Sequence, residues 1–524
     1  MVRSPEPLST KSARPLRAPQ LPLVELSPGA ARPLYEQLYL ALRDQIVRGH
    51  LRQGGRLAST RRLADHLAIS RFTVVTALER LLAEGYLEAR RGSGTFVTRT
   101  LPEHFMRPPD GQTPSPAGRD VRAALSRRGT QLSSTHVTGP RPEEPRAFQS
   151  RRGPLDVFPL RAWSAIVRRL WRRGGYKYLE YGPPAGYGPL RQAIAAHIGV
   201  TRAVRCAPEQ VIVTSGAQQA FDLLFRVLLD PGDRAWVEEP GYLDVRAALL
   251  AAGARLVPVP VDEAGVNVEE GIRLGADARV AVVSPSHQYP VGVTLSATRR
   301  LALLGWARSR GAWIVEDDYD SYFRYSGRPM SALQGVDRAT PHAHVIYVGT
   351  FSKTVFPSLR LGFCVVPESL VDAVTNARAI ADRNSPMIDQ AALTEFIASG
   401  QYERHLRRLR LVCEERYHAM RLHFERVLGE QLTLSDASAG THVLAHFRGR
   451  LANDPGLAIR VSHLAAAEGM VVFPLSRYCL TPPARDALVL GFGGLSTRRI
   501  AAGADRLAAI IRRARESGRR ARRS

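Results

Sequence analysis

Residues 345–353 read VIYVGTFSK, a β-branched and aromatic run that ends in a lysine. The run predicts a strand, and the residues after it predict a turn that carries Lys353. Of 73 basic residues only Lys11, Lys177 and Lys353 are lysine, and the other 70 are arginine. Because arginine cannot serve as an amine nucleophile, Lys353 indicates a need for a primary amine, as in a Schiff base with pyridoxal phosphate. A surface lysine retained by chance is the alternative interpretation of this position alone.

Strand-like runs and helical stretches alternate from about residue 151 onward. This order predicts an α/β domain with a mainly parallel sheet and a ligand site at the carboxyl ends of its strands. The strand candidates are 211–214, 235–237, 256–259, 280–283, 313–315, 345–348 and 362–366.

Two segments around this lysine supply groups for a phosphate. Residues 215–218 follow a predicted strand and open a helix, where backbone N–H groups and short side chains form an anion cradle. Many strand-to-helix turns look similar, so this signal is weak alone. Thr350 and Arg360 flank Lys353, and arginine can bind phosphate through two hydrogen bonds. The predicted cradle consists of Ser215, Gly216, Ala217 and Gln218.

Residues 316–320 read EDDYD and follow the predicted strand 313–315. Asp317 at the strand end can pair with the pyridine nitrogen of pyridoxal phosphate and keep it protonated, which makes the ring an electron sink. Tyr319 can hydrogen-bond the 3-oxygen of the ring, and Tyr242 can stack on the ring. Metal ligation is a competing interpretation, but no histidine lies beside the acids in sequence and the glycine of a calcium loop is missing. A solvated acidic loop is the third interpretation.

Residues 33–97 carry a separate pattern, that of a winged helix-turn-helix. Apolar residues recur at helical spacing over 34–46, and helices are expected at about 60–67 and from 71 onward, with Ser59 and Ser70 as N-caps. Two short strands enclose a basic hairpin tip, and the third helix of such a unit enters the major groove. The residues predicted to contact DNA are Ser59, Arg61, Arg62, Ser70, Arg71, Thr73, Arg90, Arg91 and Gly92.

The net charge is +25 and the pI is about 10.8. That balance favours a polyanionic partner such as nucleic acid, although compositional drift in an arginine- and alanine-rich proteome is the alternative. No apolar stretch is long enough to span a membrane, and the N-terminus lacks the apolar core of a signal peptide. The four cysteines match no metal or disulfide spacing, so we expect a cytoplasmic protein.

Composition shifts divide the chain into five predicted parts. The arginine-rich end can add nonspecific DNA affinity or be a solvated, frayed end. The parts are a flexible N-terminal arm (1–30), a winged helix (31–98), a linker rich in Pro, Gly, Ser and Arg (99–150), a large domain with the cofactor site (151–385), and a C-terminal small subdomain with the basic tail (386–524).

The N-terminal segment resembles the DNA-binding domain of GntR-family repressors almost along its whole length. So many matches in the same order make the resemblance to this family specific. The matching stretches are PLYEQL at 33–38, GGRLASTR at 54–61, LAISRFTV at 67–74 and EGYLEARRGSGTFV at 84–97.

The C-terminal motifs resemble a fold type I, aminotransferase-type pyridoxal-phosphate domain, and the whole chain resembles the MocR/GabR-type subfamily of GntR regulators. The resemblance implies a winged helix joined to that domain, with a smaller α+β C-terminal subdomain. It also implies a head-to-tail homodimer with exchanged DNA-binding domains, in which Tyr181 reaches the phosphate held by the partner subunit. Further subfamily stretches stand at 181–191, 285–292, 316–325 and 327–329.

Two departures from the aminotransferase pattern bear on catalysis. Val489 aligns with the arginine that grips the substrate carboxylate in the enzymes, and valine cannot bind a carboxylate. Arg477 or Arg485 is a possible replacement. The asparagine that usually contacts the 3-oxygen is also missing, and His287 or Gln288 is the nearest candidate. Both changes argue against an efficient amino-acid transaminase.

We therefore predict a pyridoxal-phosphate-binding transcriptional regulator with no efficient enzyme activity, although residual transaminase half-reactions are compatible with the sequence. It would bind operator DNA as a dimer and sense the cofactor, an amine or an amino acid. An active aminotransferase with an accessory DNA-binding domain is one alternative. A cofactor-free DNA-binding dimer is the other.

Overall fold

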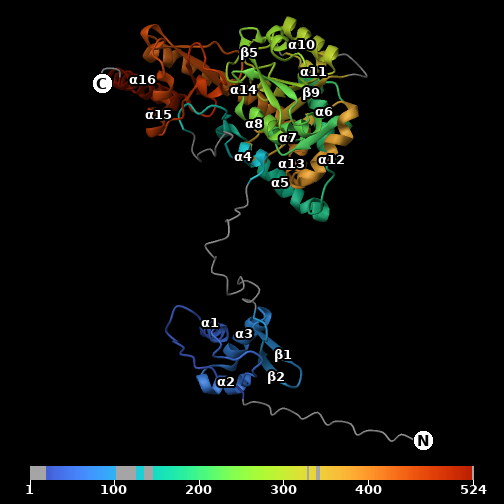
Figure 1. The fold of residues 1–524 in the computed structure, drawn as a ribbon, viewed down its shortest axis with the longest axis vertical. Helices are drawn as coiled ribbons and strands as arrows, with labels where there is room; N and C mark the ends of the chain where they lie inside the picture. Colours follow the sequence, from blue (N-terminus) through green and yellow to red (C-terminus); the bar gives the residue numbers. More distant parts are fainter. Residues whose placement is uncertain (1–18, 102–124, 135–145, 327–329, 338–342, 522–524) are drawn as a thin grey trace, which may run out of the picture. The chain divides into compact units, whose positions relative to one another are not determined.

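The computed structural model describes residues 19–101, 125–134, 146–326, 330–337 and 343–521. The chain separates into two compact units, Met1–Ala123 and Ala124–Ser524 (Figure 1). Some predicted features lie outside the described residues. They are most of the N-terminal arm (1–18), most of the linker (102–124 and 135–145), the stretch 327–329 and the last tail residues (522–524).

The first unit is a winged helix. Its helices are α1 (Leu34–Val47), α2 (Thr60–Leu67) and α3 (Arg71–Ala83), and its wing is a hairpin of β1 (Leu87–Arg90) and β2 (Gly94–Val97). The first wing strand extends to Arg90, which pairs with Gly94 across the hairpin.

The winged helix follows from caps and an apolar stripe. The Ser59 hydroxyl accepts a hydrogen bond from the Arg62 N–H at 3.3 Å, and the Ser70 hydroxyl accepts one from the Thr73 N–H at 3.1 Å. Each therefore satisfies an otherwise unpaired donor in the first helical turn, as predicted. The apolar faces of α1 and α3 share one core, which includes the fully buried Leu42 and Val74.

The second unit is built around an eight-stranded sheet with the order β3-β10-β9-β8-β7-β4-β5-β6. Neighbours from β9 to β5 are parallel, whereas β10 runs antiparallel to β3 and β9, and β6 antiparallel to β5. The mainly parallel sheet expected from the sequence is thus confirmed. The strands are β3 (Val211–Thr214), β4 (Arg234–Glu239), β5 (Arg255–Asp262), β6 (Gly265–Val266), β7 (Val280–Val283), β8 (Trp313–Asp318), β9 (Val345–Thr350) and β10 (Gly362–Val365).

Helices cover both faces of this sheet (Figure 1). Alternate side chains of β9 enter different cores: Ile346 and Val348 pack with α7 and α8, whereas Tyr347 packs with α6 and α13. A strand buried on both faces explains the continuous apolar run seen in the sequence. The helices of this region are α4 (Arg127–Ser134), α5 (Leu160–Gly174), α6 (Gly188–Arg202), α7 (Ala217–Leu228), α8 (Leu243–Ala252), α9 (Val268–Gly275), α10 (Ala297–Arg310), α11 (Leu333–Val336), α12 (Val371–Asp382) and α13 (Met387–Ala398).

A smaller α+β subdomain completes the second unit. Its antiparallel sheet has the order β11-β12-β14-β13. The long helices α14 and α16 pack against each other in its core. The elements are α14 (Gln401–Leu428), β11 (Leu432–Leu434), β12 (His442–Phe447), α15 (Leu457–Ala467), β13 (Phe473–Pro474), β14 (Ala487–Gly491) and α16 (Thr497–Ala521).

The end of the predicted linker belongs to this subdomain. Phe148 is fully buried in its core, and the Phe148 carbonyl accepts a hydrogen bond from the Gly491 N–H at 2.8 Å. Helix α4 also forms within the predicted linker. Neither feature was predicted, because the segment is rich in Pro, Gly and Arg and lacks hydrophobic periodicity. A single buried aromatic residue gives no periodic signal.

No helix in the described parts of the chain is both long enough and apolar enough to cross a membrane.

Candidate functional site

The predicted cofactor residues follow strands whose carboxyl ends share one edge of the large sheet. Asp317 is near the end of β8, in register with Val348 of β9, and Lys353 lies three residues beyond β9. Tyr242 lies between β4 and α8, and Gly216 between β3 and α7. Ligands bind at this edge in open α/β sheets.

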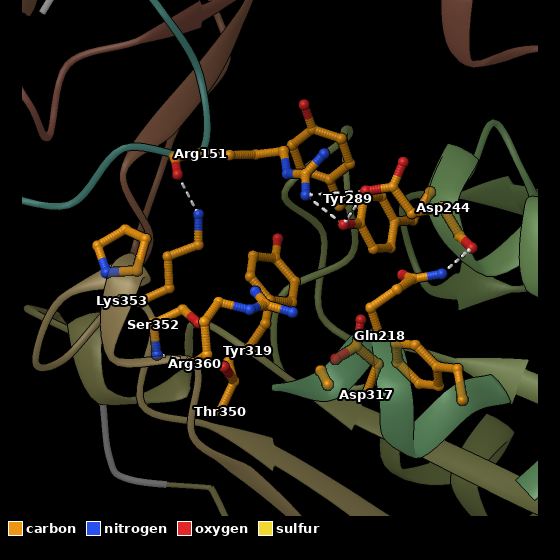
Figure 2. A pocket seen from close by; sticks show the side chains of 14 residues that line it. Arg151, Gln218, Asp244, Tyr289, Asp317, Tyr319, Thr350, Ser352, Lys353 and Arg360 are labelled. Atoms are coloured by element: carbon orange, nitrogen blue, oxygen red, sulfur yellow. Dashed lines mark hydrogen bonds and ion pairs between the residues drawn. The ribbon is translucent and has the colours of Figure 1, made fainter. Parts of the chain in front are cut away.

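These residues surround a cavity of about 370 Å³ (Figure 2). That volume is within the usual range of small-molecule pockets. Eight of the predicted cofactor residues line it, from Ala217 in the cradle to Arg360. The full lining is Arg151, Ala217, Gln218, Phe221, Tyr242, Asp244, Tyr289, Asp317, Tyr319, Thr350, Ser352, Lys353, Pro357 and Arg360.

The phosphate cradle is assembled by close backbone approach. Ser215 and Gly216 do not line the cavity but shape it, since Arg360 Nη2 donates to the Ser215 carbonyl at 2.7 Å. Gly216 has φ +85°, and a Cβ there would lie 3.2 Å from Arg360 Nη2. A side chain would therefore push Arg360 away. Gln218 is fixed by a 2.9 Å hydrogen bond from its Nε2 to the Asp244 carbonyl.

Only one of the three consecutive acids at the end of β8 lines the cavity. Glu316 accepts hydrogen bonds from backbone amides, and Asp318 forms a buried ion pair with Arg202 at 2.8 Å. Asp317 is 6% exposed and faces the cavity. Burial, and the nearby Asp318 and Glu238, raise the pKa of Asp317 to about 8. A cationic partner beside this carboxyl group, such as a protonated ring nitrogen, would offset the burial and favour the carboxylate form.

Lys353 is a buried amine on the opposite wall. Its side chain points at the segment that enters the second unit, and Nζ donates a hydrogen bond to the Arg151 carbonyl oxygen (Figure 2). Lys353 is 8% exposed. Burial raises the pKa of the neighbouring Asp320 to about 6, although the Lys353 ammonium group opposes this effect.

A buried polar cluster lies beside the cavity and consists of His287, Asp320 and His442. The sequence places no histidine beside the acidic segment, but the fold brings two. His287 Nδ1 lies 3.1 Å from the Tyr319 hydroxyl and so orients the phenol that faces the cavity. Burial, His287 and then the nearby Lys353 ammonium lower the pKa of His442. The possible ligand atoms of these three side chains all lie within 4.8 Å of one another.

Six cavity residues were not anticipated as site residues, and they are Arg151, Phe221, Asp244, Tyr289, Ser352 and Pro357. Tyr289 lines the cavity, whereas His287 and Gln288, the predicted replacements for the missing asparagine, do not. Gln288 instead donates to Glu238 at 3.1 Å, which corrects that prediction. Arg151 and Asp244 also line the cavity and form an ion pair at 3.3 Å. The last two lie 93 residues apart, so sequence spacing gave no signal of their contact.

The predicted DNA contacts lie on the surface of the first unit. All are exposed except Thr73, which is half-buried. The Arg90 guanidinium lies 4.6 Å over the Phe96 ring and pairs with Glu88 at 2.5 Å. Phe72, between two predicted contacts, is 80% exposed. An exposed aromatic side chain at the start of α3 was not singled out in the sequence.

Comparison with known proteins matches both units to families. Residues 34–97 match the bacterial regulatory proteins of the gntR family, and residues 159–485 match aminotransferase class I and II. The probable rhizopine catabolism regulatory protein MocR of Rhizobium meliloti is 39% identical, over 91% of this chain and 93% of that protein. The chain belongs to the MocR-type regulators of the GntR family.

Further relatives of this MocR-type regulator share its full architecture or its second unit. The pyridoxine biosynthesis transcriptional regulator PdxR of Corynebacterium glutamicum is 32% identical, over 90% of this chain and 94% of that protein. LysN, an alpha-aminoadipate aminotransferase from Thermus thermophilus, superposes with a TM-score of 0.64 at 27% identity. The match covers 70% of this chain and 92% of LysN, which was crystallised with N-(5'-phosphopyridoxyl)-L-leucine.

The enzyme-type carboxylate clamp is absent from its expected strand in the MocR-type chain. Val489 of β14 is fully buried in an apolar cluster with Tyr289 and Tyr478, beside the cavity. Arg477 and Arg485, the possible replacements, are exposed and do not line the cavity. Tyr181 is 79% exposed and lies outside the cavity of its own chain.

Proposed function

We propose that this MocR-type regulator binds pyridoxal phosphate in the second unit and operator DNA through residues 31–98. The cofactor, or an amine or amino acid that reacts with it, would control DNA binding. One observation carries the proposal: Asp317, near the end of β8, and Lys353, just beyond the neighbouring β9, line one cavity together with Arg360.

The cavity residues fit pyridoxal phosphate group by group. The N-terminus of α7, with Arg360 and Thr350, matches the phosphate. Asp317 matches the pyridine nitrogen, and burial raises the pKa of the Tyr319 phenol, which keeps it a donor for the 3-oxygen. Pyridoxal phosphate supplies an aldehyde that captures amines and a ring that withdraws electrons. Lys353 provides the amine that holds it covalently.

A sensing role follows from what the cavity lacks. An aminotransferase must grip its substrate and release product at each turnover, and Val489 removes the usual clamp. Without that contact, less binding energy is available to the reacting amino acid, which argues against efficient turnover and for a sensing role. The alternative, an active aminotransferase with an accessory DNA-binding domain, predicts ready turnover with amino acids.

The first unit supports the DNA-binding half of the proposal. Arg61, Arg62 and Arg71 are exposed on consecutive helices of the winged helix, and Arg91 and Gly92 form the wing tip. Arginines in these places suit phosphate contacts, and residues at the start of α3 suit base edges. The net charge of +25 adds attraction to a polyanion.

A homodimer completes the proposal. Tyr181 is exposed and close to Arg383, whose guanidinium lies 5.0 Å over its ring. Neither residue lines the cavity of its own chain. A head-to-tail dimer would place Tyr181 against the phosphate of the partner subunit and would pair the two winged helices on DNA. Ligand binding can re-space them only if the two domain arrangements bind the ligand with different affinity.

Titration of the full-length protein with pyridoxal phosphate tests the site. Wild type should develop an absorption band for the lysine-bound cofactor, and Lys353→Ala should not. Lys177→Ala is the matched control, since that lysine is exposed and does not line the cavity, and it should behave as wild type. A wild type without the band would contradict the proposal. Rapid spectral conversion by many amino acids would favour the active enzyme.

A further inference from the structure

Arg151 has an unusual backbone conformation at the edge of the cavity. Its φ is +64°, in the left-handed region that a non-glycine residue occupies at a cost in free energy. Strain of this kind persists where the surrounding structure fixes it, and it is concentrated at functional sites. Here the segment is fixed on one side by the Gly491–Phe148 hydrogen bond and on the other by Lys353 Nζ.

This conformation directs the Arg151 side chain into the cavity (Figure 2). The guanidinium carbon lies 4.3 Å from the centre of the Tyr242 ring and 6.0 Å from that of Tyr289. Nη2 donates to the Tyr242 hydroxyl and pairs with Asp244 at 3.3 Å. The side chains of Arg151 and Asp244 are 17% and 14% exposed. The guanidinium is therefore held in one orientation inside the site.

Arg151 lies near the position where aminotransferases carry the arginine that binds the substrate carboxylate. Tyr289 packs in the same apolar cluster as Val489, and its hydroxyl bonds to that of Tyr478 at 2.9 Å. The Arg151 guanidinium therefore lies near Tyr289, on the side of the cavity where Val489 provides no positive charge. The lining contains two other cations, and both already have a proposed role, because Lys353 holds the aldehyde and Arg360 holds the phosphate.

We propose that Arg151 binds the carboxylate of an amino-acid effector and so selects amino acids over simple amines. The proposal deepens the proposed function and rests on the cofactor site. Arg151 lies in the segment before the large sheet and not in β14, and its guanidinium has five donors, so it can bind a ligand carboxylate while it keeps the ion pair with Asp244. Effector recognition is thereby placed in the chain segment that leads back toward the DNA-binding unit.

A matched pair of reduced cofactor adducts tests this inference without turnover. Cofactor-free, full-length protein is titrated by calorimetry with N-(5'-phosphopyridoxyl)glycine and with N-(5'-phosphopyridoxyl)methylamine, which differ only in the carboxylate. Wild type should bind the glycine adduct about 10- to 150-fold more tightly, the range for a charge-assisted contact. Arg151→Gln should bring the ratio of the two dissociation constants close to one, and Arg151→Lys should retain part of it.

Arg152→Gln is the control, because it removes the same charge from the neighbouring residue, which does not line the cavity. It should keep the wild-type ratio. A merely structural Arg151 would weaken both adducts equally, and an unchanged ratio in Arg151→Gln would overturn the inference. A ratio near one in wild type overturns it even if the variant does not fold. If neither adduct binds, the proposed cofactor site is contradicted. Equal binding of both adducts supports the cofactor site and contradicts only the carboxylate-binding role of Arg151.

Discussion

Asp317→Asn should have two opposite effects, one on cofactor binding and one on the stability of the cofactor-free protein. Asparagine has nearly the same shape but cannot become an anion for a protonated ring nitrogen. A hydrogen bond to a charged group contributes about 1.5–3 kcal/mol, so the affinity for pyridoxal phosphate should fall about 10- to 150-fold. Burial makes the anionic form of this carboxyl unfavourable in the empty site, so its removal should stabilise the cofactor-free protein.

The size of the second effect follows from the raised pKa of Asp317, about 8 instead of 3.8. The unfolded chain ionises this group near pH 3.8, while the folded protein keeps it protonated up to about pH 8. Below pH 3.8 the group is protonated in both states, so the protonated form stabilises the folded protein fully. As the pH rises toward 8, only the unfolded chain releases the proton, and this stabilisation is lost. Between pH 5 and pH 8, the variant should gain roughly 1–4 kcal/mol relative to wild type, at about 1.36 kcal/mol per pH unit.

The assay is denaturant unfolding of cofactor-free protein at pH 5 and pH 8, together with cofactor titration by absorbance. Asp389→Asn is the control, because burial also raises the pKa of Asp389, which lies outside the cavity lining. It should change stability with pH in the same direction but leave cofactor affinity unchanged. An Asp317→Asn variant that binds the cofactor as tightly as wild type would refute the assignment of Asp317 to the ring nitrogen.

Three further substitutions test the other parts of the account. Ser70→Ala removes the N-cap of α3 and should cost about 1 kcal/mol in unfolding experiments, whereas an unchanged midpoint would argue against the cap. Arg71→Ala should weaken binding to operator DNA and reduce the slope of log affinity against log salt by about one in fluorescence anisotropy; an unaltered slope would exclude a phosphate contact. Tyr181→Phe should weaken cofactor binding about 10-fold if its hydroxyl reaches the phosphate of a partner subunit, and equal affinity would contradict that arrangement.

Local patterns made the winged helix predictable from the sequence. Ser59 and Ser70 precede apolar helical repeats, and the structure shows both hydroxyls as caps. The large sheet was predictable for a similar reason: its central strands are buried on both faces and appear as continuous apolar runs. The ends of those runs located Asp317 and Lys353, since parallel strands end at a common edge.

The remaining site residues depend on contacts that no local pattern contains. Arg151 lies in a segment without periodicity, and its partners Asp244 and Tyr289 follow it only after long stretches of chain. His287, Gln288 and Tyr289 are consecutive in a loop, where successive side chains point in different directions. Only the fold shows that Tyr289 faces the cavity while Gln288 bonds to Glu238.

The central claim is that the cofactor state of Lys353 controls DNA binding. The direct measurement is the affinity and footprint of full-length wild type and Lys353→Ala on a DNA fragment with a mapped binding site, with and without pyridoxal phosphate. Wild type should change its affinity at least about 5-fold, the lower end of typical allosteric coupling, or change its footprint, and Lys353→Ala should not respond. An identical affinity and footprint of wild type with and without the cofactor and candidate amino acids would contradict the account.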